Sequence, residues 1–236
     1  MSESKESFSR TGMLLGESAL KRLKSARVAV FGVGGVGGYT VEALARAGIG
    51  SIDIIDNDVV SKSNINRQIY ALNSTLGLYK VDVAKDRILD INPDCNVNAL
   101  KVFFMPDTAN EINFSDYDYV VDAIDTVTGK KQIILSAKAA GVPVISSMGA
   151  GNNLDNTAFK VADIYETSVC PLARVMRRIC RENGIEHLKV VYSASPSFKP
   201  SGVRTDKSKS VPGSVSFVPS VCGLIIAGEV IKDLIK

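Results

Sequence analysis

The sequence has little aromatic, histidine or zinc-ligating character, and these shortages disfavour several classes of function. Trp is absent and aromatic residues make up 6% of the 236 residues, so platforms for stacking single-stranded nucleic acid bases are scarce. The single histidine, His187, cannot build a histidine-rich metal site. The four cysteines include no pair with C-x-x-C spacing, which disfavours a structural zinc site. We therefore expect four reduced thiols in a cytoplasmic protein.

Long apolar segments and a strong net charge are also missing. The longest apolar run near the C-terminus, VCGLIIAGEVI, is too short to span a bilayer, and the N-terminal text MSESKESFSR does not have the pattern of a signal peptide. We therefore expect no stable membrane association. A net charge of +3 excludes a histone-like polyelectrolyte but leaves room for a local basic patch. With 45% hydrophobic and 22% charged residues, the composition is that of a globular protein.

Strand and helix patterns alternate along most of the chain. Buried strands are expected over 27–33, 51–58, 95–103, 117–125 and 142–148. Helices are expected over 39–50, over 79–91 and from residue 125 to about Ala140. This order predicts an α/β fold, a Rossmann-like open parallel sheet with helices on both faces.

The sequence pattern changes after residue 148, and we expect the two parts to have different roles. The second part predicts a basic amphipathic helix over 170–182, a short strand over 187–194, a polar mobile loop over 195–214 and an apolar helix over 220–235. We interpret the chain as a single domain over 1–236, with a nucleotide-binding half over about 8–148 and a substrate-side half over about 149–236.

A glycine-rich turn and a carboxylate indicate a nucleotide site. The motif G-x-G-x-x-G, supplied by Gly32, Gly34, Gly35 and Gly37, follows the first strand and opens a helix. Glycines let backbone amides approach phosphates, and the helix N-terminus favours their charge. Asp56 ends the second strand, where a carboxylate binds the ribose hydroxyl pair. A nicotinamide oxidoreductase would share both features, so the nucleotide stays open at this point.

Polar residues after the second strand favour ATP. They are Asp58, Ser63, Asn64, Arg67, Gln68 and Lys80. A triphosphate carries about four negative charges and needs fixed cations such as Arg67 and Lys80, for which a nicotinamide enzyme has no obvious need. Asp125 ends the fourth strand at the edge that faces the ligand crevice, a position suited to holding Mg²⁺. Singly, the two cations could be solvated side chains and Asp125 a helix cap; the complete set argues against that reading.

The motifs GVGGVGG, IIDNDVVSKSNINRQ and VVDAID, with Lys80, together resemble the ubiquitin-activating-enzyme-like superfamily of ThiF, MoeB and HesA types. The resemblance covers residues from about 8 to 148 and from 213 to 235, and implies a ThiF-type adenylation fold with a C-terminal extension. It implies nucleoside and ribose contacts by Gly35 and Asp56, phosphate contacts by Asn64, Arg67, Gln68 and Lys80, and Mg²⁺ at Asp125. Arg10, in FSRT, would reach the ATP of a neighbouring subunit, which implies a homodimer. The implied chemistry is attack of a substrate carboxylate on the α-phosphate of ATP, giving an acyl-adenylate and pyrophosphate.

Other segments resemble one branch of that superfamily, the tRNA threonylcarbamoyladenosine dehydratases. They are NINRQIYAL, LGLYK, INPD, GAGNN, PLARVMRR and GSVSFVPSVCGLIIAGEVI, while the two CxxC pairs of sulfur-carrier-activating members are missing. The branch implies ATP-dependent cyclisation of N6-threonylcarbamoyladenosine in tRNA, in which a tethered nitrogen closes the ring and no enzyme thiol is needed. The alternatives are adenylation of a ubiquitin-like or sulfur-carrier C-terminus, a nicotinamide oxidoreductase and a non-catalytic nucleotide-binding scaffold.

Cationic side chains in the second half suggest contact with a tRNA backbone. Arg174, Arg177, Arg178 and Arg181 recur on one helical face, and Lys199, Arg204, Lys207 and Lys209 lie in the expected loop. The alternative is a solvated basic face. Cys170 precedes Pro171 near the expected site, but without a histidine near it in sequence we expect a structural thiol. Core positions are expected for Cys95, Cys180 and Cys222, and a surface or packing role for His187.

Overall fold

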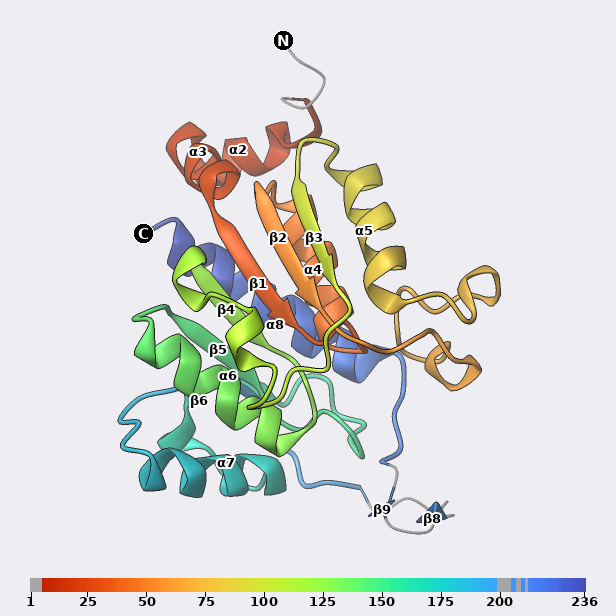
Figure 1. Cartoon of the computed structure of the whole chain (residues 1–236), viewed down its shortest axis with the longest axis vertical. Coiled ribbons are helices and arrows are strands. Elements are labelled where there is room, and N and C mark those ends of the chain that lie inside the picture. The colour runs from red at the N-terminus through yellow and green to blue at the C-terminus, as the bar shows by residue number, and fades with distance from the viewer. Residues whose placement is uncertain (1–5, 199–204, 207–208, 211) are drawn as a thin grey trace.

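A seven-stranded sheet in the order β3-β2-β1-β4-β5-β7-β6 forms the centre of the structure (Figure 1). The structure is a computed structural model that describes residues 6–198, 205–206, 209–210 and 212–236. Its strands are β1 Arg27–Phe31, β2 Ser51–Ile55, β3 Asn96–Leu100, β4 Tyr119–Asp122, β5 Val144–Ser147, β6 Phe159–Asp163 and β7 Lys189–Ser193. Neighbouring strands run parallel except β6, which is antiparallel to β7. The predicted α/β class is confirmed.

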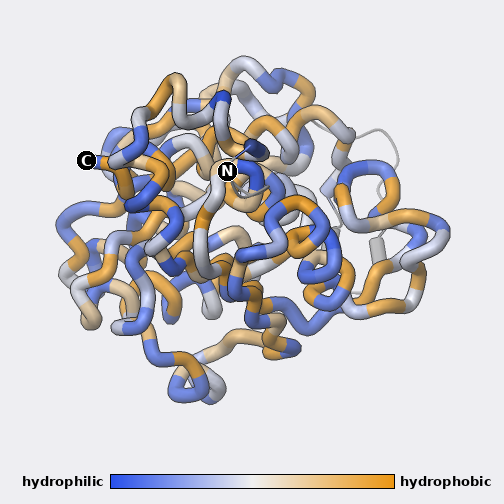
Figure 2. Tube along the Cα trace, turned by 90° about the horizontal axis from the view of Figure 1, so that it is seen from above, coloured by the Kyte–Doolittle hydropathy of each residue, from blue (hydrophilic) through white to orange (hydrophobic). Residues whose placement is uncertain are grey.

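Helices cover both faces of the sheet, and the first two of them lie beyond the amino ends of its strands (Figure 1). They are α2 Ser9–Leu15, α3 Glu17–Ser25, α4 Gly37–Arg46, α5 Lys80–Ile91, α6 Val127–Ala139, α7 Pro171–Glu182 and α8 Phe217–Leu234. Helices α4, α5 and α8 share one hydrophobic core with Val28 and Val30 of β1, whereas α6 and α7 share the other with Ala29 and Phe31. Side chains of a strand alternate between faces, so β1 contributes to both cores. Hydrophobic and hydrophilic stretches alternate accordingly along the trace (Figure 2).

The ends of the elements follow local chemistry. Helix α4 ends at Arg46, earlier than predicted, because Gly48 adopts φ +85, a left-handed conformation that closes a helix. Helix α5 ends at Ile91, as Asn92 and Pro93 predict. Strand β4 ends at Asp122 rather than at Asp125, so Asp125 lies in the connection to α6. No helix among the described residues is long and apolar enough to span a membrane.

Two parts of the fold were not predicted from the sequence: the N-terminal helices α2 and α3, and strand β6. Strand β6 is an edge strand with two consecutive exposed residues, so its sequence lacks the alternation that marks a half-buried strand. The predicted loop 195–214 lies partly outside the described residues; within it, β8 (Thr205–Asp206) pairs with β9 (Lys209–Ser210).

The strand order reverses between β1 and β4, and this position matters for ligand binding. The chain leaves β1 towards β2 on one side, while β4 pairs with β1 on the other side. Loops that follow the two strands therefore diverge and leave a crevice at the carboxyl edge of the sheet, where open α/β sheets bind ligands.

Candidate functional site

A cavity of about 580 Å³ lies at this crevice, within the size range of small-molecule sites, ~300–1,000 Å³. Residues from the loops that follow β1, β2, β3 and β4 line it. Most of the predicted site residues are among them: Gly32, Gly34, Gly35, Asp56, Asp58, Asn64, Arg67, Gln68, Lys80 and Asp125. Arg10, Gly37 and Ser63 do not line it. The structure thus brings together residues that lie more than ninety positions apart in the sequence.

The glycine loop leaves no space for side chains at its base. Gly32 has φ +85, and a Cβ atom there would lie 2.8 Å from the carbonyl oxygen of Ala123. At Gly37, the first residue of α4, a Cβ would lie 1.8 Å from the carbonyl oxygen of Gly32. Gly37 therefore closes the turn. The close turn sets the N-terminus of α4 at the cavity, an arrangement that favours phosphate.

Asp56 is fixed against the glycine loop by main-chain donors. Its Oδ2 accepts a hydrogen bond from the Val33 N–H at 2.9 Å, and its Oδ1 accepts one from the Asp58 N–H at 2.8 Å. Each carboxylate oxygen has further lone pairs. The carboxylate is thus oriented by its neighbours and keeps capacity for the hydroxyl pair of a ribose.

The segment after β2 orders the side chains predicted to bind phosphate. Asn64 ends the short 3-10 helix Lys62–Asn64, and its Oδ1 accepts a hydrogen bond from the Ser61 N–H at 3.1 Å. Arg67 Nη1 donates to the Ser63 carbonyl and to the Asn66 side chain, each at 2.9 Å. Ser63, which does not line the cavity, therefore contributes a carbonyl oxygen that orients Arg67.

Lys80 is the buried cation of the cavity. It begins α5 with 5% of its surface exposed, and its Nζ lies 2.6 Å from Asp58 Oδ2. A buried ammonium group needs a partner because it has lost its hydration, and Asp58 supplies that partner. A phosphate that binds Lys80 would share the ammonium with the Asp58 carboxylate.

Asp125 is exposed at the cavity wall, in the connection between β4 and α6. Among the described residues, no group of three or more histidine, cysteine or acidic side chains forms a metal site. Mg²⁺ does not need one, since proteins hold it through one or two carboxylates together with substrate phosphates. Asp125 lines the same cavity as Arg67 and Lys80, and a carboxylate there fits that donor set.

Sequence reasoning missed an apolar wall and a contribution from the second half of the chain. Val102, Phe103 and Phe104 follow β3 and line the cavity, as do Pro212 to Ser214 and Pro219. The Asn66 side chain donates to the Ser214 carbonyl at 2.9 Å, which joins the two halves. The rule that placed Asp56 at a strand end could also have found Phe103 and Phe104. No local pattern marks Pro212 or Pro219.

Arg10 lies on α2, exposed and beyond the amino ends of the strands, whereas the cavity lies at their carboxyl ends (Figure 1). It is therefore not part of the cavity of its own chain. Its expected role in the site of a neighbouring subunit stays a prediction.

The cysteines and the histidine have no catalytic setting in the structure. All four cysteines are free and buried, and the expected core positions of Cys95, Cys180 and Cys222 are confirmed. Burial raises the pKa of the Cys95 thiol to about 11 and that of Cys222 to about 12, which disfavours the reactive thiolate. The side chain of His187 is 85% exposed and lies 3.5 Å from Asp163, away from the cavity lining.

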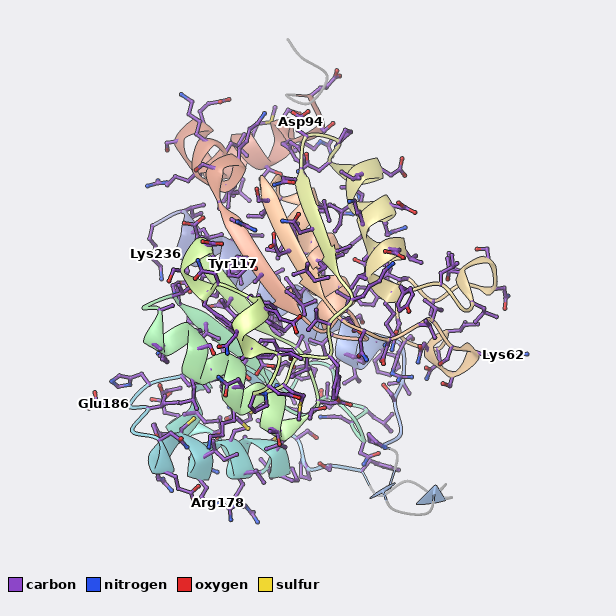
Figure 3. The ribbon with its side chains drawn as sticks, viewed as in Figure 1. Lys62, Asp94, Tyr117, Arg178, Glu186 and Lys236 are labelled. Atoms are coloured by element: carbon purple, nitrogen blue, oxygen red, sulfur yellow. The ribbon has the colours of Figure 1, made fainter. Side chains whose placement is uncertain are left out.

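Helix α7 presents part of the expected basic face. Arg174, Arg178 and Arg181 are exposed, and Arg178 extends from the outer surface (Figure 3). Arg177 is half-buried and donates to the Thr167 carbonyl at 2.5 Å, so its guanidinium is partly used within the fold. Three of the predicted loop cations, Lys199, Arg204 and Lys207, lie outside the described residues, and Lys209 lies in β9.

Comparisons with known proteins agree over nearly the whole chain. The ThiF family model matches residues 8–236. A tRNA threonylcarbamoyladenosine dehydratase of Bacillus subtilis is 45% identical over 97% of this chain and 94% of its own length. One from Haemophilus influenzae is 35% identical over 97% and 93%. The crystal structure of the E. coli tRNA N6-threonylcarbamoyladenosine dehydratase in complex with ATP matches with a TM-score of 0.89 at 33% identity, covering 98% of this chain and 94% of that chain.

Proposed function

The chain belongs to the ThiF family, and from that premise we propose that it adenylates N6-threonylcarbamoyladenosine in tRNA and thereby cyclises it with loss of water. One observation carries the proposal. A single cavity holds the glycine loop, Asp56, two cations and Asp125, in a chain that is 45% identical to a tRNA threonylcarbamoyladenosine dehydratase. Solved structures of the E. coli dehydratase contain ATP or AMP, the first substrate and a product of such a reaction.

The proposed reaction has two steps, adenylation of a carboxylate and closure of a ring. A carboxylate oxygen of the modified nucleoside attacks the α-phosphorus of ATP, and the bond to the bridging oxygen breaks, releasing pyrophosphate. The ureido nitrogen of the same nucleoside then attacks the activated carbonyl carbon, loses its proton to solvent and displaces AMP. Tethering supplies a high effective molarity, so no enzyme thiol has to carry the acyl group.

The residues of the cavity have separate tasks in this reaction. Asp56 holds the ribose, and the glycine loop lets main-chain N–H groups reach the phosphates. Lys80 and Arg67 offset the charge that develops on the leaving pyrophosphate. We place Mg²⁺ on Asp125, where the ion would supply further charge neutralisation between the phosphates.

Assembly, substrate docking and location belong to the same proposal. We expect a homodimer in which Arg10 of one subunit completes the site of the other. The exposed arginines of α7 support a contact with the phosphate backbone of tRNA, because fixed cations release counterions from it. We expect the protein to act in the cytoplasm, together with its tRNA substrate.

Adenylation of a protein tail remains the alternative function. An adenylyltransferase and sulfurtransferase of Candida glabrata is 35% identical over 74% of this chain, and this chain covers 40% of that protein. Such an enzyme would activate a sulfur carrier or ubiquitin-like C-terminus with the same cavity. The two functions differ in substrate and therefore in what stimulates ATP cleavage.

One incubation separates the two functions. The purified chain is mixed with ATP, MgCl₂ and either tRNA bearing threonylcarbamoyladenosine or a sulfur-carrier protein, and the tRNA nucleosides are analysed by mass spectrometry. We expect a nucleoside lighter by one water, with AMP and pyrophosphate formed in equal amounts, in the tRNA reaction alone. ATP cleavage stimulated by the carrier protein and not by tRNA would contradict the proposal.

A further inference from the structure

A buried ion pair lies next to the cavity, outside the residues assigned so far. Asp122 is the last residue of β4 and Lys130 lies in the first turns of α6. Both side chains are 0% exposed, and Lys130 Nζ lies 3.0 Å from Asp122 Oδ2. Neither residue lines the cavity. Because burying two charges costs about as much as their attraction returns, a fully buried pair is weak support for a role in stability alone.

The pair holds the main chain that leads to Asp125. Lys130 Nζ donates to the Ile124 carbonyl at 3.0 Å, and Asp122 Oδ1 accepts from the Ile124 N–H at 3.4 Å. Both main-chain groups of the residue before Asp125 are therefore bonded to the pair. Ser146 Oγ, from the neighbouring strand β5, donates to Asp122 Oδ2 at 2.5 Å and fixes the carboxylate in turn.

Strand β1 and the glycine loop contact the same segment. The Ala123 N–H donates to the Phe31 carbonyl at 2.9 Å. The absence of side chains at Gly32 and Gly37 lets Ala123 approach, since a Cβ at Gly37 would lie 3.2 Å from that of Ala123. The segment from Ala123 to Asp125 is thus restrained both by these contacts and by the ion pair.

Asp125 itself has no such support. Within the described part of the chain, its carboxylate makes no hydrogen bond or ion pair, although it lines the cavity. Its position therefore depends on its main chain, and that main chain depends on Ile124.

We propose that Asp122 and Lys130 are positioning residues that set the Asp125 carboxylate against the phosphates of ATP. The inference rests on the proposed function in one respect: it assumes that Asp125 binds the Mg²⁺ that accompanies ATP. Without the pair, both main-chain groups of Ile124 lose their partners and the carboxylate shifts. Misplacement by about 1 Å in a reactive site costs on the order of 10²-fold in rate.

The test uses a variant that removes both charges together. Lys130→Met alone would leave Asp122 charged, buried and unpaired, which destabilises a fold strongly. In Asp122→Leu with Lys130→Met, apolar side chains fill the space, and this exchange is often neutral for stability. Lys138→Met is the matched control, since Lys138 is an exposed lysine in the last turn of the same helix. Ser146→Ala keeps both charges and removes one bond to Asp122.

Calorimetry with AMP and with ATP, each with and without MgCl₂, separates positioning from a structural role. AMP lacks the β- and γ-phosphates, which are the groups that Mg²⁺ held at Asp125 would neutralise. We expect the double variant to bind AMP like the wild type, to lose the gain in ATP affinity that MgCl₂ gives, and to lose turnover on the order of 10²-fold. Ser146→Ala should shift in the same direction by less and serves as the test if the double variant does not fold.

Two results would overturn the inference. The first is a folded double variant whose ATP affinity responds to MgCl₂ as in the wild type, which would show that Asp125 does not depend on the pair. If the double variant does not fold, the same response in Ser146→Ala has the same meaning. Equal losses of AMP and ATP affinity show that the pair merely maintains the cavity. Wild type and Asp125→Ala are measured in parallel. If MgCl₂ has no effect on ATP binding by the wild type, or the same effect on Asp125→Ala, the proposed Mg²⁺ site fails first.

Discussion

The two halves of the chain place their charged residues in different ways. In the half before residue 149, the charged side chains of the candidate site line a cavity, and neighbours orient several of them, as Asp58 orients Lys80 and two main-chain N–H groups orient Asp56. In the half after it, Arg174 and Arg178 extend from the surface of α7. Fixed, enclosed charges suit a small ligand bound in one geometry, whereas exposed charges suit a large polyanion whose contacts are many and separately weak.

The halves are distinct in sequence and continuous in space. Helix α8 returns from the end of the chain to pack beside α4, so closely that a Cβ at Gly223 would lie 2.3 Å from the carbonyl oxygen of Val36. Pro219 at the start of α8 lines the cavity that the first half builds. The second half therefore contributes a wall to the cavity as well as the exposed arginines of α7.

The change with the largest expected effect is at Asp125, an exposed carboxylate of the cavity. Asp125→Ala should abolish turnover and leave the fold intact, because it removes a proposed Mg²⁺ ligand and no core contact. Cyclisation of tRNA nucleosides and thermal unfolding are measured on the same preparation. Turnover near that of the wild type would mean that the metal lies elsewhere.

The enclosed cations should have the next largest effect. Lys80→Ala and Arg67→Ala should each lower the rate on the order of 10²–10³-fold, since each removes a charge proposed to stabilise the leaving pyrophosphate. Lys62→Ala is the matched control, because Lys62 lies on the same segment and extends away from the protein (Figure 3). Single-turnover formation of AMP is the measurement. An equal loss in the control would assign the effect to the segment rather than to the cavity.

Parts of the site were predictable because they follow from position along a strand. The carboxyl ends of parallel strands meet at one edge of a sheet, so the glycine loop, Asp56 and Asp125 had to lie near one another. The ion pair of Asp122 with Lys130 could not be found in this way. A carboxylate near the end of a strand and a lysine early in a helix are ordinary in sequence, and only packing shows that both are buried.

The surface of the second half was harder to predict for a related reason. The spacing of the α7 arginines places them on one face, but it does not show that the Arg177 guanidinium turns to the Thr167 carbonyl. Strand β6 was missed because an edge strand needs little hydrophobic alternation, and the pairing with β7 that defines it is not local in sequence.

A variant of Arg10 tests whether the two halves of one chain are sufficient to form a complete site, or whether a partner subunit contributes to it. If it serves the site of a partner subunit, Arg10→Ala and Asp125→Ala should each be inactive alone and active when mixed. Random mixing makes half of the dimers mixed with one intact site each, so we expect about a quarter of wild-type activity. Subunit exchange is verified by mass spectrometry. No recovery after verified exchange would place Arg10 in its own chain's chemistry or outside the reaction.

The exposed charges of α7 should have a smaller effect of a different kind. Replacing Arg174 and Arg178 by alanine should raise KM for tRNA and leave ATP binding unchanged. The slope of the logarithm of the tRNA binding constant against the logarithm of the salt concentration should decrease in magnitude by about one for each lost phosphate contact. The control is the replacement of Lys21 and Lys24, exposed cations of α3 at the amino edge of the sheet. If this salt slope is unchanged in the α7 variant and decreases in the Lys21 and Lys24 variant, the tRNA binds at the amino edge of the sheet instead.

The smallest expected effect concerns a contact that joins the two halves. Asp233, near the end of α8, lies 2.5 Å from Lys189 Nζ of β7 and accepts a hydrogen bond from Tyr119 of β4 at 2.8 Å. Burial raises the pKa of Asp233, but the hydrogen bonds from Lys189, Lys236 and Tyr119 outweigh it and lower the pKa from 3.8 to about 2. A lowered pKa in the folded state means that the charged carboxylate stabilises the fold above pH 4. That contribution, at most roughly 2 kcal/mol, is lost as the pH falls from about 4 to 2.

Asp233→Asn should therefore lower the free energy of unfolding at neutral pH and weaken its pH dependence between about pH 4 and 2, as urea titrations at several pH values would show. Asp94→Asn is the control, because Asp94 pairs with Lys24 on the surface, where ion pairs contribute little. If both variants lose the same stability, the contact between α8 and the sheet is no stronger than a surface pair, and α8 is held to the first half by its apolar face alone.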